Sequence, residues 1–84
     1  APDAPEIDPD GGTFGAQTDI TITVPENCKV YYTWDSSDPS AASTEYTAPI
    51  PVPEGNNVLS VIAIDQNTGK RSDIYRSRFE FYMN

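Results

Sequence analysis

The chain has 84 residues, a formal net charge of −8, no histidine and one cysteine, Cys28, a size that predicts a single domain with one modest core. Because it has neither a basic stripe nor an apolar run long enough to cross a bilayer, we expect no nucleic-acid partner and no membrane insertion. One cysteine excludes an internal disulfide, and without a second cysteine or a histidine it predicts no metal site.

The N-terminal residues have the composition of a linker. Ala1-Pro2-Asp3-Ala4-Pro5 is rich in proline, and neither an initiator methionine nor a signal peptide is visible. We therefore expect residues 1–4 to be the remnant of a linker, residues 5–82 to form the domain and residues 83–84 to be a tail. Proline on both sides of Glu6-Ile7 predicts a short edge strand, because proline supplies no ladder donor.

Two alternating segments predict half-buried strands. Residues 19–24 and 29–35 each place apolar side chains at every second position, which is the period of a strand. The expected inward sets are Ile20, Ile22 and Val24 in the first segment and Val30, Tyr32 and Trp34 in the second. We expect the second set to pack against Ile20, Ile22 and Leu59. Cys28 is expected in the turn between the two strands.

Asp35-Ser36-Ser37-Asp38-Pro39-Ser40 predicts a structural turn. Asp and Ser side chains bond nearby backbone amides, and proline fixes its own φ. We expect the Asp35 carboxylate to accept an amide hydrogen bond from Ser37 or Asp38, with Pro39 restricting the residue before it. Asp35, Ser37 and Asp38 are also three oxygen donors in one turn, but a calcium loop pattern is missing, so we expect no metal here.

The second half of the chain predicts an edge segment, a central strand and a hairpin. Two prolines within residues 46–52 confine that stretch to a sheet edge. Residues 54–57 predict a turn, and residues 58–65, apolar on both faces, predict a central strand. Gly69 is the expected positive-φ residue of the loop that follows. Residues 72–82 predict the last strand, with a bulge between Ile74 and the Phe79/Phe81 pair because their parity differs.

Six to seven short strands without helical crossovers predict an all-β, largely antiparallel sandwich of the immunoglobulin or fibronectin-III-like kind. The chain also resembles the chitobiase/β-hexosaminidase C-terminal domain family over about residues 5–81. The segments that carry the resemblance are Pro5-x-Ile7-x-Pro9-x-Gly11-Gly12-Thr13-Phe14, Val30-Tyr31-Tyr32-Thr33-x-Asp35-x-Ser37-x-Pro39, Tyr46-x-x-Pro49-Ile50, Leu59-x-Val61-x-Ala63-x-Asp65 and Gly69-x-x-Ser72.

The resemblance implies an accessory module of a bacterial secreted or cell-envelope protein, without an active site of its own. Its expected partners are the neighbouring domains of the parent protein, and we expect a monomer, no cofactor and no catalytic residue. Ser36 stands where the family usually has glycine, which suggests a turn that needs no positive φ at this position. The primary hypothesis is a structural spacer or docking module.

Carbohydrate binding is the alternative. Sugar rings stack on exposed aromatic side chains, and the chain is rich in tyrosine. The candidates are Tyr31, on the outer face of its strand, and Tyr75 and Tyr82 in the last strand, with a polysaccharide as the partner. The other interpretation is that these rings cover a sheet face or contact neighbouring domains. The two hypotheses differ in whether exposed aromatic rings gather on one face.

Overall fold

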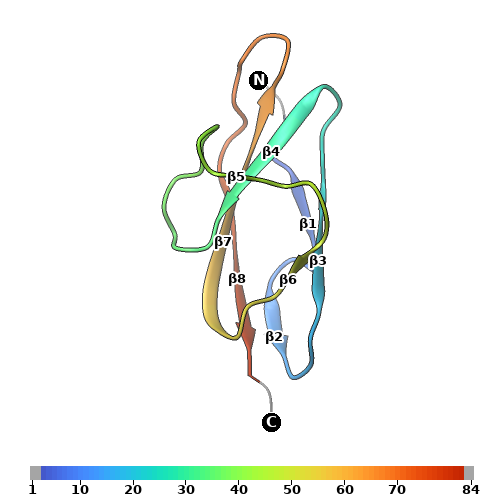
Figure 1. Cartoon of the computed structure of the whole chain (residues 1–84), viewed down its shortest axis with the longest axis vertical. Coiled ribbons are helices and arrows are strands. Elements are labelled where there is room, and N and C mark those ends of the chain that lie inside the picture. The colour runs from blue at the N-terminus through green and yellow to red at the C-terminus, as the bar shows by residue number, and fades with distance from the viewer. Residues whose placement is uncertain (1–2, 83–84) are drawn as a thin grey trace.

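Eight strands and no helix form within residues 3–82, the part of the chain that the computed structural model describes (Figure 1). They are β1 (Glu6–Asp8), β2 (Gly12–Phe14), β3 (Asp19–Thr23), β4 (Cys28–Thr33), β5 (Thr44–Glu45), β6 (Ile50–Pro51), β7 (Gly55–Asp65) and β8 (Tyr75–Phe81). The expected tail at residues 83–84 and half of the expected linker, residues 1–2, lie outside the described residues.

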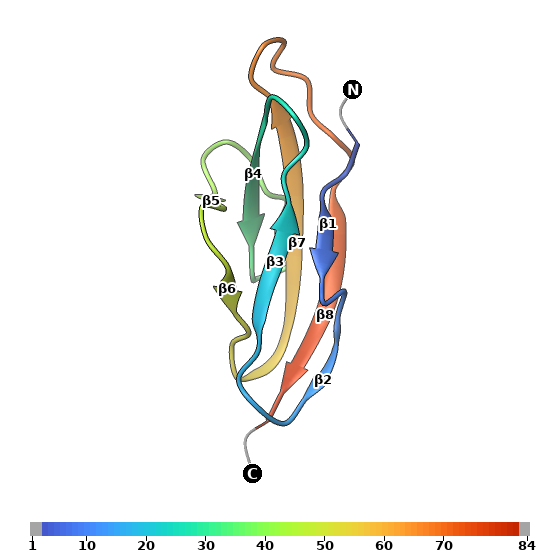
Figure 2. The same ribbon diagram turned by 90° about the vertical axis from the view of Figure 1, so that its right-hand side faces the viewer.

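The strands form two sheets that face each other. The smaller sheet has the order β1-β3-β6 and the larger the order β2-β8-β7-β4-β5 (Figure 2). The pairings between these strands are antiparallel except β2 with β8, which is parallel. An isolated bridge between Asp35 and Val58 is parallel as well. The all-β sandwich expected from the alternating segments is therefore confirmed. The strand count exceeds six to seven because two short strands, β2 and β5, lie outside the segments expected to be strands.

The core lies between the sheets and is built by strand alternation. Ile20 and Ile22 of β3 face Val30 of β4 and Leu59 and Val61 of β7, all nearly or completely buried. This confirms the inward parity expected for residues 20, 22, 30 and 59. Tyr32 and Trp34 were expected to share the inward face with Val30, but they are less buried than it is. Both are half-buried and pack at the margin of this cluster.

One expectation at the β3–β4 connection is wrong. Val24 is 43% exposed rather than inward, because β3 ends at Thr23 and the pleat does not continue. The expected turn forms, and Cys28 closes it, because its amide donates to the Pro25 carbonyl at 3.1 Å. Cys28 is also the first residue of β4, where it pairs with Asp65 and packs against the core. Within the turn Asn27 has a φ of 62°, a value that asparagine tolerates better than most residues.

Two further corrections concern β7 and β8. The turn expected at residues 54–57 is wrong, because β7 already begins at Gly55. The φ of Gly55 is 103°, a value that glycine adopts without a steric penalty. The expected bulge is also wrong: β7 and β8 pair without interruption from Gly55↔Phe81 to Val61↔Tyr75. Ile74 precedes β8 and is half-buried, so its parity belongs to the opposite face of the sheet.

The loop between β4 and β5 lies on the outer face of the larger sheet, away from the smaller one (Figure 1). Its Asp38 carboxylate forms an ion pair with Arg76 at 2.6 Å, and Arg76 alternates with the inward residues of β8. Pro39 is buried. Ser60, which pairs with Arg76, is fully buried although its alternation with Leu59 and Val61 directs it outward. We attribute its burial to this loop.

Candidate functional site

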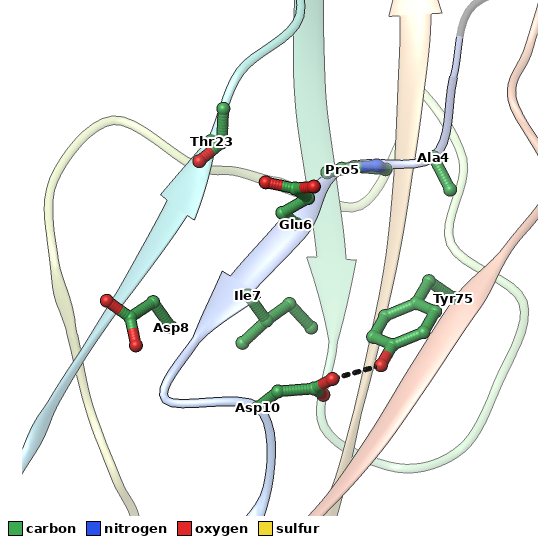
Figure 3. Close-up of a pocket in the computed structure, with 8 residues that line it drawn as sticks. All are labelled: Ala4, Pro5, Glu6, Ile7, Asp8, Asp10, Thr23 and Tyr75. Carbon is green, nitrogen blue, oxygen red and sulfur yellow. Dashed lines mark hydrogen bonds between the residues drawn. The ribbon is translucent and has the colours of Figure 1, made fainter.

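An open groove of about 640 Å³ lies where β1 and β8 approach each other from different sheets (Figure 3). Its walls carry the carboxylates of Glu6, Asp8 and Asp10 and the ring of Tyr75. Glu6 and Asp8 flank the buried Ile7 in β1 and are exposed, as strand alternation requires. The groove is thus acidic on the β1 side and aromatic on the β8 side.

Asp10 is the centre of the hydrogen bonding in this groove. Its carboxylate accepts a hydrogen bond from the Tyr75 hydroxyl (Figure 3). It accepts another, at 2.8 Å, from the Ser77 hydroxyl. Both donors lie on the inward face of β8, whereas Asp10 belongs to the connection between β1 and β2. The two bonds therefore fasten this connection to the other sheet. No local pattern in the sequence indicates this cluster, because Tyr75 and Asp10 are 65 residues apart.

The chemistry of this cluster is that of a structural hydrogen bond. The bond to Asp10, then burial and the charge of Asp10, hold the pKa of Tyr75 above its ordinary value, so the phenol stays protonated. A protonated phenol that donates to a carboxylate is neither a nucleophile nor a base. Among residues 3–82 no group of three or more His, Cys, Asp or Glu side chains is arranged to hold a metal ion.

The turn expected at Asp35 forms as predicted in its hydrogen bonding. Oδ1 of Asp35 accepts the Ser37 amide at 3.1 Å and the Ser37 hydroxyl at 2.6 Å. These two bonds lower the pKa of the exposed Asp35 carboxyl. Thr33 donates its hydroxyl to the Ser37 carbonyl at 2.9 Å, which ties the turn to the end of β4.

The expectation about Ser36 is wrong. Its φ is 67°, so the turn requires the left-handed region at this position even though glycine is absent. An L-residue other than glycine adopts this conformation at a cost, and the two bonds between Asp35 and Ser37 span the strained residue. At Gly69 the expected positive φ is confirmed, at 74°. There the Asp65 carboxylate accepts the amides of Asn67 and Thr68, which organises the hairpin loop.

The three candidate tyrosines do not come together. Tyr31 is half-buried on the outer face of the larger sheet, opposite Ile62. Tyr75 is half-buried on the inner face of the same sheet, in the groove. Tyr82 is 51% exposed just beyond the end of β8. A ligand that stacks on one of these rings therefore has no access to all three.

Cys28 lies in a second, smaller groove of about 360 Å³, with Asp65 and Lys70 among its neighbours. Burial, and then the negative charge of Asp65, raise the pKa of the thiol. A thiol with a raised pKa is less available as a thiolate, which is the reactive form. The position of Cys28 is thus that of a small residue in the packing.

Two packed sheets of short, mainly antiparallel strands, with loops closed by their own side chains, define a β-sandwich module of the immunoglobulin-like class. The family model of the chitobiase/beta-hexosaminidase C-terminal domain matches residues 9–76, and the chain belongs to this family. The family is a non-catalytic accessory domain at the C-terminus of those enzymes. Neither the curated proteins nor the solved structures give a match to the chain. No helix in the described residues has the length and hydropathy to span a membrane.

Proposed function

We propose that this domain is a non-catalytic spacer and docking module within a larger bacterial secreted or cell-envelope protein. The observation that carries the proposal is the path of the chain through an elongated body of 46 × 21 × 16 Å. The chain comes in toward β1 from one end of the long axis, and β8 leaves at the other end (Figures 1 and 2). Domains attached at the two ends are thereby held apart by the length of the sandwich.

Rigidity distinguishes such a spacer from a flexible linker. An unstructured Gly/Ser chain of 84 residues has a root-mean-square end-to-end distance of about 50 Å, similar to the long axis of the domain. The two cases therefore differ in the spread of distances rather than in the mean. A sandwich of paired strands fixes one separation, whereas the linker samples a broad distribution.

The test is single-molecule energy transfer between fluorescent domains fused to the two ends, with the Gly/Ser chain as the control. A single narrow distribution that broadens to that of the control in urea is expected. A distribution as broad as the control in buffer would refute the spacer. The same samples are then titrated with chitooligosaccharides, cellulose fragments and peptidoglycan fragments, which should leave the distribution unchanged.

Carbohydrate binding remains the second candidate because Tyr75 lines a groove that also carries carboxylates. An aromatic ring beside hydrogen-bonding groups is a combination that binding sites for small polar ligands use. A glycan array probed with the wild-type domain, Tyr75→Ala and the matched control Tyr82→Ala tests it. Retention of wild type and Tyr82→Ala but not Tyr75→Ala would establish this function in place of a pure spacer.

A further inference from the structure

The parallel pair of β2 and β8 lies on the path along which tension crosses the molecule. If the domain is the spacer proposed above, its two neighbours load it from opposite ends. The first strand on this path, β1, has three residues and pairs with β3 alone. Once β1 has separated from β3, the force from the N-terminal side acts on Asp10 and then on β2. The opposite force acts on the C-terminal end of β8.

Parallel strands that are loaded from opposite ends slide past each other. β2 and β8 are joined in the register Gly12↔Phe79, Thr13↔Glu80 and Phe14↔Phe81. Because sliding stretches every bond of such a patch at once, the bonds share the load. In an antiparallel hairpin pulled apart from one end, the bonds break one at a time. The parallel pairing of β2 with β8 is therefore the contact that resists shear.

Hydrogen bonds lie at both ends and at the centre of this patch. At its lower end the Tyr82 amide donates to the Phe14 carbonyl at 3.2 Å, and at its central rung Thr13 Oγ1 donates to Glu80 Oε2 at 3.1 Å. At its upper end Asp10 accepts the hydroxyls of Tyr75 and Ser77 from β8. Hydrogen bonds to an ionised carboxylate are stronger than neutral ones.

Gly11 allows this close contact. Its φ is 76°, and a Cβ at this position would lie 2.8 Å from the Arg78 carbonyl oxygen. Backbone can approach backbone here because glycine has no side chain. Asp10, at the start of the turn, is thereby brought within reach of Ser77 in β8.

The geometry points to a mechanical function: β2, β8 and Asp10 form a shear clamp that keeps the module folded under end-to-end tension. The inference rests on the proposed spacer role, because only a module that links two domains is loaded in this direction. The resistance depends on the direction of force, since unfolding under force is governed by the unfolding rate along the pulled coordinate.

Single-molecule force spectroscopy with two attachment geometries tests the clamp. In the first, handles are attached at the two chain ends. In the second, one handle is attached at the exposed Glu54 through a bioorthogonal side chain and the other at the C-terminus. Gly55 pairs with Phe81, so this geometry peels β8 from β7 rung by rung. We expect a rupture force several-fold higher in the first geometry. Equal forces would overturn the clamp.

Matched variants identify the contacts that bear the load. Tyr82→Pro removes the amide donor to Phe14, while Tyr82→Ala keeps it and removes the same side chain. We expect only the proline variant to lower the end-to-end rupture force. Asp10→Ala should lower the end-to-end force and leave the peeling force unchanged. Equal effects of Tyr82→Pro and Tyr82→Ala, or of Asp10→Ala in both geometries, would contradict the clamp.

Failure of the clamp and failure of the spacer give different results. The spacer is measured without force, by the width of the distance distribution. A narrow distribution together with equal rupture forces in both geometries would leave a rigid spacer without a clamp. A broad distribution would remove the spacer and, with it, the reason for end-to-end loading.

Discussion

The indole of Trp34 meets the ring of Phe79 in a T-shaped arrangement, with centroids 6.0 Å apart and ring planes at 72°. Phe79 belongs to β8 and is completely buried, while Trp34 directly follows β4 and is half-buried. Phe14 stacks on the same ring, with centroids 6.2 Å apart. Phe79 thus connects the last strand to the first part of the chain and to the end of β4.

Replacing Trp34 should weaken the fold through this contact. We expect Trp34→Ala to lower the free energy of unfolding by about 3 kcal/mol, near the lower end for large aromatic truncations because the ring is only half-buried. Trp34→Phe, which keeps an aromatic ring, should cost distinctly less. Urea unfolding followed by circular dichroism measures both. A loss below about 1 kcal/mol for Trp34→Ala would place the indole outside the core.

The turn at Asp35 gives a prediction that separates structure from ligand binding. Asp35→Ala removes the acceptor of both Ser37 bonds, so the melting temperature at pH 7 should fall. Because the pKa of Asp35 is lowered in the fold, this stabilisation is present above its ordinary pKa and is lost as the pH falls below about 4. The difference between wild type and variant should therefore shrink in acid.

An alternative interpretation makes Asp35 and Ser37 polar contacts to a sugar, with Tyr31 as the ring on which the sugar stacks. Under that interpretation Asp35→Ala melts like the wild type at pH 7 but is no longer retained on a polysaccharide that retains the wild type. Thermal melts and a retention assay on the same variant are sufficient to decide between the structural turn and the sugar contact. An unchanged melting temperature with lost retention would favour the carbohydrate site over the structural turn.

Ser36 predicts a stabilising substitution. Its φ of 67° costs a residue with a Cβ about 1–2 kcal/mol, whereas glycine adds about 0.5–1 kcal/mol of unfolded-state entropy. Ser36→Gly should therefore raise the free energy of unfolding by roughly 0.5 kcal/mol. Gly69→Ser is the reverse change at a φ of 74°, where a Cβ would have no atom within 4 Å, and it should destabilise through the backbone alone. The same sign for both variants in urea unfolding would contradict this account.

Sequence alternation predicted the layers of this fold but not the contacts across it. Ile20, Ile22, Val30 and Leu59 are inward as expected, because a period of two in a half-buried strand leaves one choice of face. Val24 continues the alternation but is exposed, because nothing in the sequence pattern marks the end of β3 at Thr23. Strand ends depend on where the partner strand stops, which is a tertiary property.

The cluster at Asp10 illustrates what local pattern does not contain. Asp10-Gly11-Gly12 predicts a turn, and the turn forms, but its carboxylate binds donors in the last strand of the chain. Ser36 failed for a related reason. Its residue type favours an ordinary φ, yet the bonds from Ser37 to Asp35 and from Thr33 to Ser37 hold it in the left-handed region. At Ser36 hydrogen bonds to other residues outweigh the local preference, whereas at Asp10 they add a contact to the last strand that the local pattern does not contain.

Ser60 has a buried hydroxyl whose effect on stability can be measured. Its Oγ is buried and has no hydrogen-bond partner among the described residues. An unsatisfied buried hydroxyl costs about 1–3 kcal/mol, so Ser60→Ala should raise the stability, by at most about 1 kcal/mol since alanine also leaves a small void and favours strands less. Ser72→Ala is the control, because Ser72 Oγ accepts the Ala63 amide and donates to Asp73. It should destabilise; a loss of stability for Ser60→Ala as well would mean that its hydroxyl is satisfied.

The bond between Tyr75 and Asp10 predicts a dependence of stability on alkaline pH. The pKa of Tyr75 is raised in the fold, chiefly by its hydrogen bond to Asp10. A group whose pKa is raised on folding stabilises the protein below its unfolded pKa, about 10 for tyrosine, and loses this effect as the pH rises through the folded value. The melting temperature of Tyr75→Phe should therefore lie below that of the wild type up to about pH 10 and approach it above.

Asp10→Asn and the double variant Tyr75→Phe/Asp10→Asn show whether this dependence arises from the pair. Because both single changes break the same contact, their effects at pH 7 should sum to more than the effect of the double variant. Fluorescence-detected melts between pH 7 and 11 provide the measurement, and the range spans the ordinary pKa of tyrosine. Additive losses at pH 7, or a wild-type advantage that persists unchanged to pH 11, would show that the phenol and the carboxylate act independently. In that case the attachment of the β1–β2 connection to β8 would depend on Ser77 alone.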